Sequence, residues 1–188
     1  MKIGHSDSVS MTVMSDSFYA SELEINIVDA AGFYDTRGFE INISNNVNLK
    51  AMINNSKSIR VVLLISWYSL LADRSTGLNS MLEMAYQIFG SREQLIKKKD
   101  SILINVTRIP SDITFGQIQD KFLSSDSEEI RLLGERLIIF DIFESGEIKD
   151  SSNREESYDK IRELEKIRNP REFFNIALTD KDEKELLK

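Results

Sequence analysis

An aspartate and a glycine stand close together at the end of a short apolar segment near the start of the chain. Alternation of apolar and polar residues predicts a strand over Glu24–Val28, and Asp29 follows it directly. Gly32 comes three residues later, in a loop that does not continue the strand. A carboxylate at the carboxyl end of a strand can hold magnesium, and a nearby glycine lets the backbone approach a phosphate. The spacing indicates a magnesium–nucleotide site, and a helix cap or solvated turn is the simpler alternative for the same aspartate.

The hydrophobic pattern predicts the elements that must position these residues. After the first strand, strands alternate with helix-length segments, which predicts an α/β fold with a doubly wound, mostly parallel sheet and helices on both faces. The near-continuous apolar run Ser58–Trp67 fits a strand that is covered on both faces. The other predicted strands are Ser101–Val106 and Arg136–Phe143, and the predicted helices are Phe39–Asn55, Leu78–Phe89 and Ile113–Leu133.

The two ends of the chain have a different character from this alternating body. Residues 1–21 are rich in Ser, Asp and Thr, which predicts loop or irregular chain, with Ser10–Thr12 as the one stretch that could enter an edge strand. Asn153 with Glu156 three residues later forms a capping-box pattern, so a densely charged helix is expected to begin there. Its apolar positions, up to Ile167, form a narrow stripe. The expected division is an α/β domain over residues 1–146 and a charged helical extension over residues 147–188.

Composition excludes several classes of function. The 188 residues include no cysteine and one histidine, so Cys-ligated metals, thiolate nucleophiles and His-rich zinc sites are ruled out. A formal net charge of −7 argues against a protein that coats nucleic acid. No apolar run reaches the roughly 20 residues that span a bilayer, and the polar N-terminus does not look like a signal peptide. A cytoplasmic location is the expectation.

Ligands of doubly wound sheets bind at the carboxyl ends of the strands. The residues predicted there are Asp29, Ser66–Ser69, Thr107, Arg108 and Asp141. Paired carboxylates elsewhere, at Glu128–Glu129 and Glu155–Glu156, are expected on solvated helix faces without a catalytic role.

One segment is similar to a known family. Asp29-Ala30-Ala31-Gly32-Phe33-Tyr34-Asp35-Thr36 resembles the third GTPase motif of the septin-like, immunity-associated nucleotide-binding GTPases, in which Asp-Thr-Pro-Gly-Phe-x-Asp-Thr is common. The order of elements downstream is also similar, and the resemblance covers roughly Gly4 to Phe143. It implies a P-loop NTPase-like fold, GTP as ligand, magnesium as cofactor and GTPase-like chemistry.

The resemblance assigns roles residue by residue. Asp29 would hold magnesium through water, the Gly32 amide would face the γ-phosphate, and Thr12 would be the threonine of the switch segment that touches the metal. Thr107 and Arg108 would lie at the base. Family members usually carry Lys at the position of Arg108 and often an Asp at that of Pro110, so guanine selectivity is in doubt.

A phosphate-binding loop is the part of the resemblance that is missing. Such a loop needs Gly-x-x-x-x-Gly-Lys-Ser/Thr, and none of the eight glycines is followed by lysine. Only eleven residues precede Thr12, so the N-terminal strand and phosphate cradle are expected to be absent and the sheet incomplete. Either the chain is a fragment, which we favour, or it has lost the cradle. The fragment hypothesis predicts exposed apolar strand edges.

The residues and the resemblance together suggest two functions from different classes. The first is a GTP- and magnesium-binding domain fragment that hydrolyses little or nothing. The second is a degenerate G-domain that acts as a nucleotide-independent protein-interaction module. A protein partner, or a homodimer formed through the nucleotide face, fits either. A flavodoxin-like or response-regulator fold is a further alternative, but it would require an acidic cluster at the first strand end, and Asp29 has no neighbouring carboxylate before Asp35.

Overall fold

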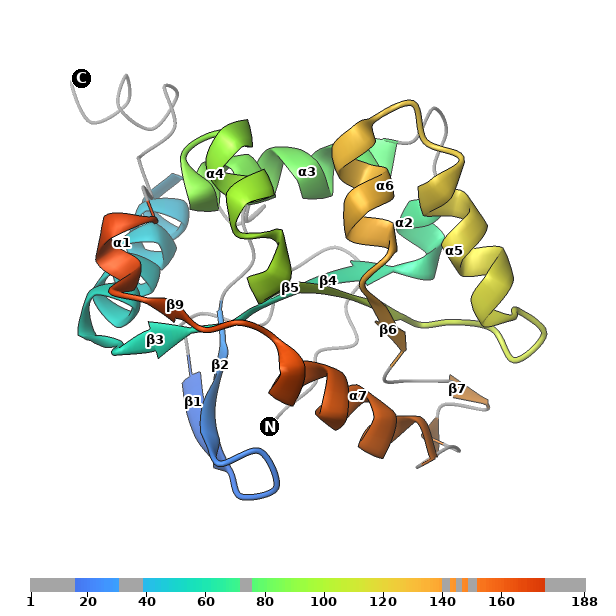
Figure 1. Cartoon of the computed structure of the whole chain (residues 1–188), viewed down its shortest axis with the longest axis horizontal. Helices are drawn as coiled ribbons and strands as arrows, with labels where there is room; N and C mark the ends of the chain where they lie inside the picture. The colour runs from blue at the N-terminus through green and yellow to red at the C-terminus, as the bar shows by residue number, and fades with distance from the viewer. Residues whose placement is uncertain are drawn as a thin grey trace. The chain divides into compact units, whose positions relative to one another are not determined.

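The computed structural model describes residues 16–30, 39–71, 76–139, 143–144, 147–148 and 152–174 (Figure 1). The chain divides into two units. One is formed by residues 58–168, and the other by residues 1–57 together with residues 169–188. Each unit has its own sheet and its own helix or helices. This division differs from the boundary expected near residue 146, because the charged helix that follows it belongs to the same unit as the parallel sheet.

The unit of residues 58–168 is built on a three-stranded parallel sheet with the strand order β4–β5–β6. β4 (Val61–Ser66) pairs along its whole length with β5 (Ile102–Thr107). β6 (Leu137–Ile139) pairs with the other side of β5. The first five residues of β5 are buried, as expected for a central parallel strand of Ile, Leu and Val. The predicted mixed α/β character with parallel strands is confirmed.

Helices fill both connections of this sheet and lie on one side of it (Figure 1). Between β4 and β5 come α2 (Trp67–Leu70), α3 (Thr76–Phe89), α4 (Arg92–Lys97) and the 3-10 turn η2 (Lys99–Ser101). Between β5 and β6 come α5 (Phe115–Leu123) and α6 (Glu128–Gly134). Their apolar residues meet the sheet in a core that includes Ala85, Phe89, Ile118, Phe122 and Ile130. Trp67, the last residue of the apolar run Ser58–Trp67, is buried, whereas Tyr68 after it is exposed.

The single helix predicted over Ile113–Leu133 is wrong, because the structure has two helices there. Ser124–Ser127 separates α5 from α6, and the serine-rich sequence offers side-chain hydrogen bonds that compete with the helical ones. Ser127 caps α6 by accepting a hydrogen bond from the Ile130 amide at 3.4 Å. Thr114 and Gln117 form a capping box at the start of α5. The break falls in a run of six polar residues, 124–129, and the apolar residues on either side of it were assigned to one helix.

The charged helix predicted to begin near Asn153 exists as α7 (Ser152–Glu163) and lies on the other side of the sheet from α3 to α6 (Figure 1). Ile167, predicted on its apolar stripe, instead belongs to β9 (Ile167–Arg168), which pairs antiparallel with β3 (Ser58–Ile59). Arg60 fixes this return of the chain, since its Nε donates to the Leu164 carbonyl at 2.9 Å and its Nη2 to the Arg162 carbonyl at 3.1 Å.

The last predicted core strand, Arg136–Phe143, is confirmed over Leu137–Ile139. β6 covers Leu137–Ile139, while Phe143 belongs to β7 (Phe143–Glu144), which pairs antiparallel with β8 (Glu147–Ile148). The residues between β6 and β7, Asp141 among them, lie outside the described part of the chain. The predicted site residue at the end of this strand therefore has no described position.

The other unit contains a β-hairpin and a long helix. β1 (Asp16–Ala20) pairs antiparallel with β2 (Ile25–Asp29), so Asp16 lies opposite Asp29 in register. The predicted strand over Glu24–Val28 is confirmed with a shift of one residue, whereas the irregular chain predicted up to residue 21 includes β1. α1 (Phe39–Asn55) has the predicted bounds, and it contacts η3 (Pro170–Glu172).

Candidate functional site

Three of the residues predicted at strand ends lie at the carboxyl edge of the parallel sheet: Ser66, Thr107 and Arg108. Thr107 is the last residue of β5, lies opposite Ser66 of β4 and is half-buried. Ser66 is itself engaged, because its hydroxyl caps α2 by accepting a hydrogen bond from the Tyr68 amide at 3.2 Å. Arg108 follows Thr107 and is exposed. Thr107 and Arg108 therefore occupy the edge at which ligands of parallel α/β sheets bind.

The backbone at Arg108 is in an unusual conformation. Its φ of 55° lies in the left-handed region, which costs a non-glycine residue about 1–2 kcal/mol. The next residue, Ile109, is buried and anchors the turn, and Pro110 follows. Strained positions of this kind persist where the surrounding structure determines them, and they cluster at binding sites. The turn holds the Arg108 backbone directly beyond the end of β5.

Arg108 has no ion-pair partner within the described part of the chain. Its guanidinium is thus available to a ligand. A planar guanidinium on a flexible stem can stack on a flat ring or donate hydrogen bonds to an anion.

Asp29 is the last residue of β2, as its sequence pattern predicted. Its side chain is half-buried, and Ala30 after it is exposed. The carboxylate therefore lies at the end of the hairpin where β2 finishes. Thr12 and Gly32, the other predicted metal and phosphate residues, lie outside the described residues. Asp29 belongs to the hairpin unit and Thr107 and Arg108 to the sheet unit, and the structure describes the two halves of the predicted site separately.

The described residues fit a magnesium ion only if the phosphates of a bound nucleotide and water supply most of its oxygen ligands. In the described part of the chain no group of three or more His, Cys, Asp or Glu side chains could hold a metal ion. Magnesium usually keeps several waters and takes one or two carboxylates together with substrate phosphates. Asp29, an oxygen ligand at a strand end, meets that limited requirement.

An ion pair between an exposed arginine and a buried carboxylate on the helical layer was missed by sequence reasoning. Glu129, predicted to be solvated together with Glu128, is only 6% exposed and pairs with Arg92 of α4. The Ser127 hydroxyl donates to Glu129 Oε2 at 2.7 Å. Burial raises the pKa of Glu129, but hydrogen bonds from Ser127 and its own backbone amide, with the charge and hydrogen bond of Arg92, outweigh burial and leave that pKa lowered.

The charge of Glu129 also affects a residue of a third helix. Burial raises the pKa of Tyr86 on α3, and the negative charge of Glu129 adds to the rise. The ion pair thus connects α4 and α6, and Tyr86 of α3 lies near enough to be affected by the charge of Glu129. The only local signal was the spacing of Ser127 and Glu129 at a helix start, while the partner Arg92 lies far away in sequence. The prediction that Glu129 is solvated is wrong for this reason.

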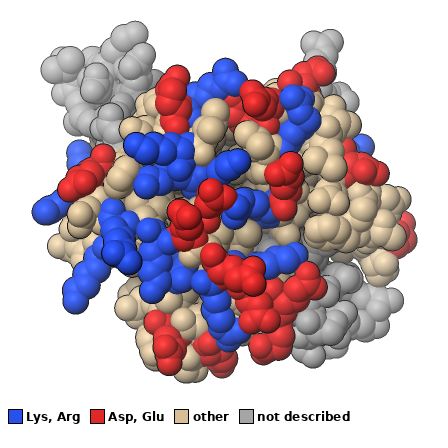
Figure 2. Space-filling view, viewed as in Figure 1, with Lys and Arg blue, Asp and Glu red and all other residues tan. Residues whose placement is uncertain are grey.

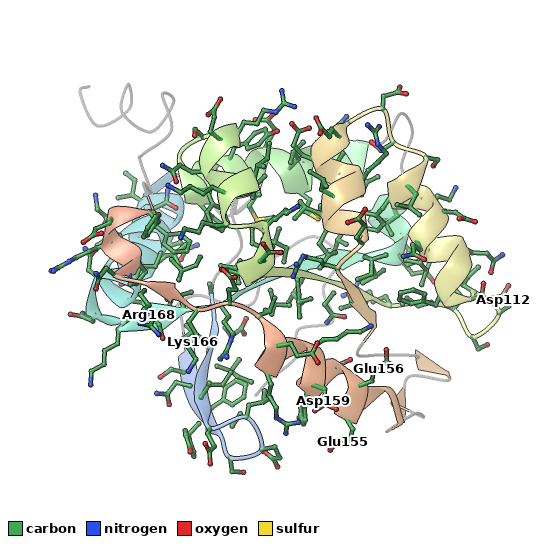
Figure 3. The ribbon with its side chains drawn as sticks, viewed as in Figure 1. Asp112, Glu155, Glu156, Asp159, Lys166 and Arg168 are labelled. Carbon is green, nitrogen blue, oxygen red and sulfur yellow. The ribbon has the colours of Figure 1, made fainter. Side chains whose placement is uncertain are left out.

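The other carboxylate pair is exposed as predicted. Figure 3 shows Glu155, Glu156 and Asp159 along α7. Glu156 pairs with Lys160 at 2.9 Å and Asp159 with Arg162 at 2.5 Å, which are exposed contacts within one helix. On the face seen in Figure 2, cationic and anionic side chains are interspersed. Such a face does not form the uniform basic surface of a protein that coats nucleic acid.

Comparisons with known proteins identify no family for this chain. No protein-family model, no curated protein and no solved structure matches it. Among the described residues, no helix has the length and apolar character required to cross a membrane.

Proposed function

We propose that the chain is a nucleotide-binding, GTPase-like domain of the septin-like class, with a doubly wound P-loop NTPase-like fold. One observation carries the proposal. Polar residues that suit a nucleotide stand directly at strand ends, with Asp29 closing β2 and Thr107–Arg108 closing the central parallel strand β5. The left-handed turn at Arg108 and the absence of an ion-pair partner for its guanidinium in the described chain support a ligand-facing role.

Each residue has a defined part in this proposal. Asp29 and Thr12 would hold magnesium through oxygen atoms, and the Gly32 amide would donate to the γ-phosphate. Thr107 and Arg108 contact the base, where the guanidinium lies against the ring face. Bound magnesium supplies charge neutralisation of the phosphates. The proposal concerns binding, since γ-phosphoryl transfer also needs groups that cradle the phosphates.

Titration of the purified protein with fluorescent GTP and ATP analogues, with magnesium and with EDTA, tests the proposal. Saturable, magnesium-dependent binding is expected. Asp29→Ala should abolish the dependence on magnesium, and Arg108→Ala should weaken binding about tenfold, the effect of losing about 1.4 kcal/mol of stacking and charge interaction. Arg168→Ala is the matched control, because Arg168 is also exposed but lies on β9.

Two results would contradict the proposal. If neither nucleotide binds at any concentration, the chain is not a nucleotide-binding domain, and a nucleotide-independent interaction module is the remaining function. If binding occurs but Arg108→Ala and Arg168→Ala weaken it equally, the base does not lie at the end of β5.

A further inference from the structure

The outer edge of β4 is unprotected by any strand that the structure describes. Within the described residues of the unit 58–168, β4 has a hydrogen-bonded neighbour on one side only, which is β5. An edge strand presents a row of unpaired N–H and C=O groups to any other strand. Proteins normally protect such edges with charged residues, proline or a short strand. β4 has six residues, Val61–Ser66, and contains no charge and no proline.

The described residues around β4 do not supply the missing protection. Arg60 immediately precedes the strand, but its guanidinium is directed to the carbonyls of Leu164 and Arg162. The opposite edge of the sheet differs, because β6 has three residues, and the Lys160 ammonium on α7 donates to the Leu137 carbonyl at 3.4 Å. β4 is therefore the longer and the less protected edge of this sheet.

Leu64 at the centre of this edge is 60% exposed, although it lies in the most apolar run of the chain. Its neighbour in the sheet, Asn105 of β5, is buried. Leu64 and Asn105 lie side by side in the sheet, and the side chain is covered on β5 but uncovered on β4. Exposure of a leucine in a strand with this composition shows that the face of the sheet lacks cover at β4, and an added strand would bring side chains beside Leu64 on that face.

We propose that β4 pairs antiparallel with β4 of a second copy of this chain, about a two-fold axis that passes beside Leu64. In that register Leu64 lies opposite Leu64 of the second copy. Leu63 then lies opposite Ile65, and Val62 opposite Ser66. Residues directly opposite in an antiparallel pair lie on the same face, so the two exposed leucines cover each other. The two sheets join into one continuous sheet of six strands.

The strand is suited to its own copy for a simple reason. A two-fold contact is self-complementary, so any charge in the strand would face the same charge nearby. β4 has none. Five facing residues per strand bury less than the roughly 1,200 Å² below which complexes are weak and transient. The association is therefore expected to be reversible and to increase with protein concentration.

Sedimentation velocity of the full chain over a wide concentration range tests this. The wild-type protein should shift from monomer to dimer as its concentration rises. Leu64→Lys should abolish the shift, because two ammonium groups would meet on the axis. Leu123→Lys is the matched control, since Leu123 is also exposed (41%) but lies on α5, and it should dimerise like the wild type.

A second measurement identifies the register. The chain has no cysteine, so Leu64→Cys and Leu123→Cys each carry a single thiol. A short bis-maleimide should cross-link Leu64→Cys into a covalent dimer, because opposite Cβ atoms in such a pair are about 4.5–5.5 Å apart. Leu123→Cys should not be cross-linked, because Leu123 lies on α5 and away from the proposed contact.

A wild-type protein that stays monomeric at all concentrations overturns the proposal. So does a dimer that Leu64→Lys leaves intact, or one in which Leu64→Cys does not cross-link. Larger aggregates that both lysine variants leave unchanged overturn it as well. Far-UV circular dichroism verifies that each variant is folded before its association is judged.

Discussion

Gly134 allows α6 to pack against α5, and replacing it with alanine tests that packing. An added Cβ would lie 2.4 Å from the Phe122 Cβ and 3.2 Å from its Cγ. Phe122 is fully buried, and its Cβ is fixed to the backbone of α5, so the clash cannot be relieved by turning a flexible side chain. α5 and α6 would have to move apart.

The magnitude follows from two opposing effects. Overpacking of a core costs about 1–3 kcal/mol. Alanine in a helix gains up to about 1 kcal/mol over glycine, but Gly134 is the last residue of α6, where this gain is small. A net loss of about 1–2 kcal/mol is expected for Gly134→Ala. For a chain of this size each kcal/mol lowers Tm by about 2–4 °C, so the expected drop is about 2–8 °C.

Gly116 on α5 is the matched control. A Cβ there meets no atom within 4 Å. Gly116→Ala should therefore stabilise the protein by about 0.5–1 kcal/mol through the lower backbone entropy of its unfolded chain. Thermal unfolding and urea titration of both variants measure the difference. If Gly134→Ala is as stable as Gly116→Ala, or more stable than the wild type, α6 does not pack on Phe122 as described.

Two further predictions concern Arg108 of the candidate site and the ion pair between Arg92 and Glu129. Arg108→Gly removes a side chain from a left-handed position, so it should raise the free energy of unfolding by up to about 1 kcal/mol in urea titrations while it weakens nucleotide binding. A loss of stability would show that the Arg108 side chain contributes more through packing than its backbone costs. Glu129→Gln should be less stable than the wild type at pH 7, and the difference should shrink in acid. The pKa of Glu129 is lower in the folded protein than its ordinary value of about 4.5, so the ionised carboxylate stabilises the fold above that pH. This stabilisation is lost as the pH falls through the pKa of the folded protein. The measurement is urea unfolding from pH 7 to pH 3, and Glu128→Gln, altered at an exposed carboxylate, is the control that should change the stability at pH 7 little.

Local pattern was sufficient where an element depends on its own residues. The apolar runs predicted β4, β5 and β6. For Phe39–Asn55 the spacing was ambiguous, and the length of the run favoured a helix, which α1 confirms with the same bounds. β1 was missed because Asp16–Ala20 is short and partly polar, and it becomes a strand only by pairing with β2. Ile167 was assigned to a helix because it continues the spacing of α7, while the strand partner Ser58–Ile59 lies about a hundred residues earlier. Pairings of this kind leave no local signal.

The candidate site shows the same limit. The ends of β2 and β5, with Asp29, Thr107 and Arg108, could be predicted because a strand's last residue is a local property. The left-handed turn at Arg108 could not, because no glycine or asparagine marks it in the sequence. The Arg92–Glu129 pair could not be predicted either, because burial of Glu129 depends on α4.

For β4 the sequence predicts more contacts than the described sheet contains. Its composition is that of a strand with neighbours on both edges and cover on both faces. The described sheet of residues 58–168 supplies one neighbour and leaves Leu64 exposed. An uncharged apolar edge of six residues is open to pairing with another chain, and a second copy of this chain is the proposed occupant. The self-complementary register about Leu64 gives that occupant a defined geometry, and a single lysine on the axis is sufficient to exclude it.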